Sequence, residues 1–114
     1  MRKKRIDPGV WRVSDRPRAL IEDADFGFAL STATTLRRAG YAVAICRGPE
    51  PDEYCPLVGA HECALVAGAD VVVSGLGDEI EAAVRRRHPS IPVVQPADSE
   101  TLVASVKQAI GGTA

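Results

Sequence analysis

Aromatic side chains are scarce in this chain, which has one Trp, two Tyr and two Phe among its 114 residues. A buried core must therefore be built mainly from Val, Ile, Leu and Ala, the other residues that supply apolar surface. No apolar run approaches the ~20 residues that a membrane-spanning helix needs. The basic N-terminus lacks the apolar stretch of a secretory signal, so we expect a cytoplasmic protein that does not bind membranes.

Length and charge limit the organisation of the chain. At 114 residues it is long enough for one domain with a core, and too short for two. Residues 1–18 contain seven Lys or Arg and two Asp, a balance of +5, so the remaining residues sum to −6 because the whole chain is −1. We predict a basic N-terminal arm over residues 1–17 and one domain over residues 18–112. This arm could bind nucleic acid or an acidic partner, lie on the acidic pocket of its own domain, or be solvated, and elsewhere we expect no nucleic-acid binding.

Strand and helix patterns alternate after residue 18. Strands are predicted over four short apolar runs: residues 18–22, 41–46, 69–74 and 91–95. Helices are predicted over three amphipathic segments: residues 25–39, 78–87 and 99–110. In the first helix we expect one apolar face to point inward: Phe26, Ala29, Leu30, Ala33 and Leu36. We expect Gly40 to end this helix, and His88 to end the second as a cation that suits the helix dipole.

This order of elements predicts an α/β fold with three layers. Parallel strands need crossover connections, so we expect a doubly wound parallel sheet of four to five strands in the order 2-1-3-4, with helices on both faces. Val71, Val72 and Val73 should lie at its centre, and residues 41–46 should be buried on both faces. A loop rich in Cys and Pro, residues 47–68, follows the second strand, and only a short helix near residues 63–67 is expected in it.

Four patches of the chain resemble, in this order, response-regulator receiver domains: residues 19–23, 36–43, 69–76 and 95–103. The first is similar to that family's first strand with its acidic pair, and the second to the end of its first helix and its second strand. The third resembles the strand that ends in the phosphate acceptor, and the last resembles the Lys-Pro segment before the final helix. The resemblance implies a shortened flavodoxin-like (CheY-like) fold and a role in two-component signal transduction.

The chain departs from the receiver pattern at the residues that do the chemistry. The position of the phospho-accepting Asp is occupied by Gly75, or by Ser74 if the register shifts by one, and Gln95 replaces the Lys. Without the carboxylate no acyl phosphate forms, and without Lys its charge has no fixed counterion.

A degenerate acidic pocket is left, formed by Glu22, Asp23, Gly75 and Gln95. Glu22 and Asp23 could bind Mg²⁺ weakly, or be solvated acids at a strand end. We therefore expect a receiver-like regulatory module without enzymatic activity. Its expected partner is another protein or a second copy of the chain.

Three cysteines lie in or beside the Pro-rich loop. They are Cys46, Cys55 and Cys63, with His61 two residues before the last, and no C-x-x-C pair occurs. Three interpretations remain open: packing residues, a redox pair that includes Cys55, or a site for zinc or an iron–sulfur cluster that uses the cysteines and His61. The last two would make the chain a redox or metal sensor, which is the alternative to an interaction module.

Overall fold

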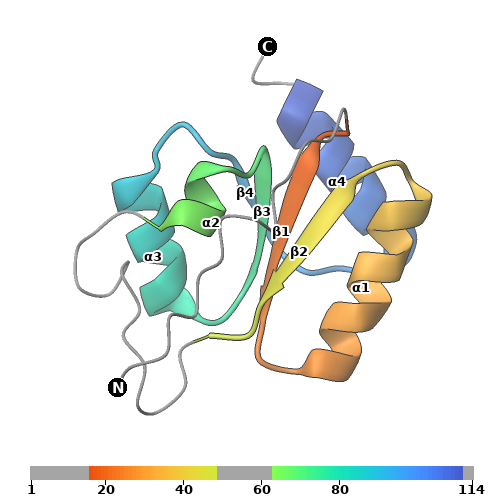
Figure 1. Ribbon diagram of the computed structural model, residues 1–114, viewed down its shortest axis with the longest axis horizontal. Coiled ribbons are helices and arrows are strands. Elements are labelled where there is room, and N and C mark those ends of the chain that lie inside the picture. Colours follow the sequence, from red (N-terminus) through yellow and green to blue (C-terminus); the bar gives the residue numbers. More distant parts are fainter. Residues whose placement is uncertain (1–15, 49–62, 112–114) are drawn as a thin grey trace.

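The computed structural model describes residues 16–48 and 63–111. Four strands and four helices alternate along these residues, as Figure 1 shows. The strands are β1 (Arg18–Asp23), β2 (Ala42–Cys46), β3 (Val71–Gly75) and β4 (Val93–Val94). The helices are α1 (Phe26–Arg38), α2 (Ala64–Ala67), α3 (Asp78–Arg87) and α4 (Ser99–Gly111). The predicted strand and helix types are all confirmed.

The strands form one parallel sheet in the order β2-β1-β3-β4, which confirms the predicted order. In the register of the sheet, Leu20 on β1 lies beside Ala44 on β2 and beside Val72 on β3. β1 and β3 are therefore the central strands. Because all strands run the same way, their carboxyl ends meet at one edge of the sheet, and α1 and α3 begin there (Figure 1).

Each face of the sheet has its own apolar core. Successive strand residues point to opposite faces, so Ile21 and Val73 join α1 and α4 on one side, while Leu20 and Val72 join α2 and α3 on the other. Val71, Val72 and Val73 are at most 1% exposed, which confirms their predicted place at the centre. No helix of the described residues is long and apolar enough to cross a membrane.

The predicted apolar face of α1 is wrong at two positions. Phe26 and Leu30 are 46% and 43% exposed, although both were expected to point inward. The buried arc is centred on Ala29, Ala33 and Leu36, because small residues let the helix approach the sheet closely. Leu30 lies about 100° around the helix from Ala29, outside that arc.

The second strand is less buried than predicted. Only Ala44 of β2 is fully buried, and the other four residues are partly exposed. The reason is the strand order, because β2 is an edge strand with a neighbour on one side only. Gly40, just after α1, has a positive φ of 102°, which confirms the predicted helix end.

Candidate functional site

Glu22 and Asp23 end β1 at the carboxyl edge of the sheet and point to opposite faces. Glu22 is 2% exposed and lies in register between Cys46 on β2 and Ser74 on β3, on the face covered by α2 and α3. Asp23 is partly exposed and lies beside Gly75, on the face covered by α1 and α4. The backbone thus divides the two acids of the predicted pocket between the two layers.

The carboxylate of Asp23 lies directly over Gly75. A Cβ atom added at Gly75 would be 2.9 Å from Asp23 Oδ2 and 2.8 Å from the backbone oxygen of Glu22. Real Cβ atoms are not found that close to backbone oxygen, so the position has no room for a side chain. Glycine in a strand often marks a close backbone approach, and Gly75, the last residue of β3, makes such an approach to Glu22.

Two acidic side chains, Asp23 at the end of β1 and Asp25 just after it, accept hydrogen bonds from the backbone at the start of α1. Asp23 Oδ1 accepts a hydrogen bond of 2.9 Å from the backbone N–H of Asp25. Asp25 Oδ1 in turn accepts one of 3.1 Å from the N–H of Phe28, which makes Asp25 the N-cap of α1. Among the described residues, no three His, Cys, Asp or Glu side chains are grouped to hold a metal ion.

Gln95 is hydrogen-bonded to α3 and not to the acids of β1. Its Nε2 donates a 2.9 Å hydrogen bond to Oε1 of Glu81 on α3. Arg85 donates to the other oxygen of Glu81, at 2.9 Å from Nη2. The hydrogen bond from Gln95, followed by that from Arg85, lowers the pKa of Glu81 below its ordinary value, against a smaller opposing effect of burial. Gln95 thus contributes to a polar network on α3, and Glu81 is a member that the sequence did not indicate.

Cys46 and Cys63 contribute to the same apolar layer from opposite ends. Cys63 is buried in the cluster between the sheet and α2/α3, and Cys46 packs against that cluster from the end of β2. The backbone N–H of Cys63 donates a 3.1 Å hydrogen bond to Nε2 of His88, which follows α3. The carbonyl of His88 accepts from Ile91 N, two residues before β4, so His88 lies near the start of that strand. Cys55 and His61 lie outside the described residues.

His88 is the C-cap of α3, which confirms the predicted helix end, and its buried side chain accepts a hydrogen bond. The side chain is 7% exposed, and its Nε2 can accept from Cys63 only when that nitrogen has no proton. The two residues are 25 positions apart, so no local pattern could have predicted the contact.

We expect His88→Ala to destabilise the domain by about 1–3 kcal/mol, because it removes the buried hydrogen bond that the N–H of Cys63 donates to Nε2. His88→Gln should retain part of that stability, since its amide oxygen can accept in place of Nε2. Urea unfolding measures both variants, and hydrogen exchange at the amide of Cys63 reports the contact directly. Unchanged exchange in His88→Ala would contradict this role for His88.

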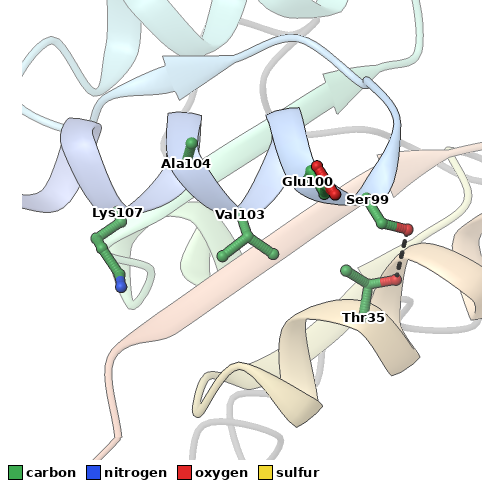
Figure 2. A pocket seen from close by; sticks show the side chains of 6 residues that line it. All are labelled: Thr35, Ser99, Glu100, Val103, Ala104 and Lys107. Carbon is green, nitrogen blue, oxygen red and sulfur yellow. Dashed lines mark hydrogen bonds between the residues drawn. The ribbon is translucent and has the colours of Figure 1, made fainter.

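A groove lies between α1 and α4. It has a volume of about 520 Å³, and Figure 2 shows the six residues that line it: Thr35, Ser99, Glu100, Val103, Ala104 and Lys107. Five of these are on α4, and the hydroxyls of Thr35 and Ser99 lie 3.4 Å apart across the two helices. A smaller hollow of about 250 Å³ shares Thr35 and Ser99 and extends to Phe28. The sequence did not indicate this groove because it depends on how α1 and α4 pack together.

Comparisons with protein-family models, with curated proteins and with solved structures gave no match. The function must therefore be argued from the geometry of the carboxyl edge and of the helix surfaces.

Proposed function

We propose that the chain is a regulatory, protein-binding module with a receiver-like (CheY-like) fold that does not transfer phosphoryl groups. The observation that supports this most directly is the contact over Gly75. The position that would hold an acceptor carboxylate is closed on one side by the backbone of Glu22 and on the other by the carboxylate of Asp23.

The remaining acids of this edge are poorly placed for phosphoryl transfer. One oxygen of Asp23 accepts from the backbone at the start of α1, and Asp25 caps the same helix. Gln95 is neutral and is bonded to Glu81, so it supplies no counterion for a phosphoryl group. An acyl phosphate would need both a free carboxylate nucleophile and a fixed positive charge.

Exposed apolar side chains near this edge support a role in protein binding. Phe26, Phe28 and Leu30, all in the first half of α1, are between 42% and 46% exposed. The guanidinium carbon of Arg47 lies 4.9 Å from the ring centroid of Phe26, so an arginine also borders this surface. Aromatic side chains and arginine are the residue types that anchor protein interfaces most often.

We expect no phosphorylation when the protein is incubated with acetyl phosphate and Mg²⁺, because Gly75 offers no acceptor. Intact-mass spectrometry should show no gain, and a beryllofluoride mimic should leave the amide NMR spectrum unchanged. A receiver domain with its acceptor Asp, treated in parallel, is the positive control. Stoichiometric acyl phosphate on Asp23 or Asp78 would contradict the proposal.

A further inference from the structure

The outer face of α4 presents four residues to the groove: Glu100, Val103, Ala104 and Lys107. Val103 is partly exposed, and the other three are exposed. Figure 2 shows Glu100 and Lys107 toward the two ends of this row, with Val103 and Ala104 between them. A short apolar centre is thus flanked by one negative and one positive charge.

The charges of Glu100 and Lys107 have no ion-pair partner in the part of the chain that the structure describes. Among residues 16–48 and 63–111, the salt bridge observed joins Arg85 to Glu81, and neither Glu100 nor Lys107 takes part in an ion pair. Seven residues separate them, which is two helical turns or about 10 Å along α4. They are too far apart to pair with each other, yet they lie on the same face of the helix.

The spacing makes this face complementary to itself. The midpoint between Glu100 and Lys107 falls between Val103 and Ala104. If a second α4 helix lies antiparallel across that midpoint, each Glu100 meets the partner's Lys107, and the apolar residues meet at the centre. A parallel arrangement would place like charges together. The small side chain of Ala104 allows the two helix backbones to approach closely.

We propose that this face of α4 binds a second copy of the chain, with the two α4 helices antiparallel about a two-fold axis at Val103 and Ala104. The interface is isologous, since each copy contributes the same surface. A different protein would need a positive charge opposite Glu100 and a negative charge opposite Lys107 at the same spacing. A second copy of α4 already has this arrangement when it lies antiparallel. This surface is separate from the carboxyl edge, so dimerisation through it does not depend on the absence of phosphoryl transfer.

The test is the oligomeric state of two charge-reversal variants, measured by analytical ultracentrifugation. We expect the native protein to form dimers, and both Glu100→Lys and Lys107→Glu to dimerise at least roughly tenfold more weakly, because each places like charges at two symmetry-related contacts. An equimolar mixture of the two variants should form dimers again, since one chain is then positive and the other negative at both positions. High salt should weaken the native dimer.

Matched controls are Glu79→Lys and Arg86→Glu on the exposed surface of α3, which change the net charge by the same amounts. Each control variant alone, and an equimolar mixture of the two, should dimerise as the native protein does. Circular dichroism checks that all variants fold. A native protein that stays monomeric at high concentration would overturn the proposal. So would a dimer that is unaffected by the changes at Glu100 and Lys107, or variants that do not recover when mixed.

Discussion

Val72→Asp is expected to unfold the domain. Val72 is 0% exposed and lies on β3, one of the two central strands, between Leu20 on β1 and Val93 on β4. An aspartate here would bury an unpaired charge in an apolar layer that offers it no partner. The cost is several kcal/mol, which is comparable to the whole stability of a small domain.

Far-UV circular dichroism and thermal melting measure this effect. The variant should lose its cooperative transition and most of its helical signal. Ala82→Asp, which introduces the same charge at an exposed position of α3, is the control and should melt close to the native protein. A native-like transition in Val72→Asp would mean that Val72 is not at the centre of a buried sheet.

The sheet could be predicted from the sequence because each strand is a short apolar run between turn residues. Parallel connections then restrict the strand order to very few choices. The fourth strand is shorter than predicted, two residues instead of five, since Pro92 has no N–H for the ladder and Pro96 follows closely. The carbonyl of Pro92 still accepts from Val72, so the chain enters the sheet where predicted.

The site could be predicted only in part, because the sequence does not give the directions in which side chains point or the distances between elements. The sequence placed Glu22 and Asp23 at the carboxyl edge, but consecutive strand residues point to opposite faces, which separates them. The resemblance to receivers predicted that Gly75, or Ser74, stands where their acceptor carboxylate would be. It did not indicate that Asp23 and the backbone of Glu22 close that position. The contact of His88 with Cys63 and the groove beside α4 also depend on packing between elements.

Gly75→Asp, which would insert a carboxylate at the position that we propose corresponds to the receiver acceptor, is expected to destabilise the protein without making it phosphorylatable. The new Cβ would lie 2.8 Å from the backbone oxygen of Glu22 and 2.9 Å from Asp23 Oδ2. These two short contacts can be relieved only if the central strands move apart, and such overpacking typically costs about 1–3 kcal/mol. The added carboxylate also faces the like charge of Asp23, which increases the cost.

Urea unfolding measures the loss, and intact mass after acetyl phosphate treatment measures any phosphorylation. Gly75→Ala adds the Cβ without the charge and should already lower the unfolding midpoint. Combining it with Asp23→Ala should recover only part of the loss, because the backbone oxygen of Glu22 remains in place. Gly27→Ala is the control, since its Cβ would lie an ordinary 3.5 Å from Asp25 Oδ1 and alanine favours helix. If Gly75→Ala were as stable as the native protein, the position would have room for a side chain, and the absence of phosphoryl transfer could no longer be attributed to this contact.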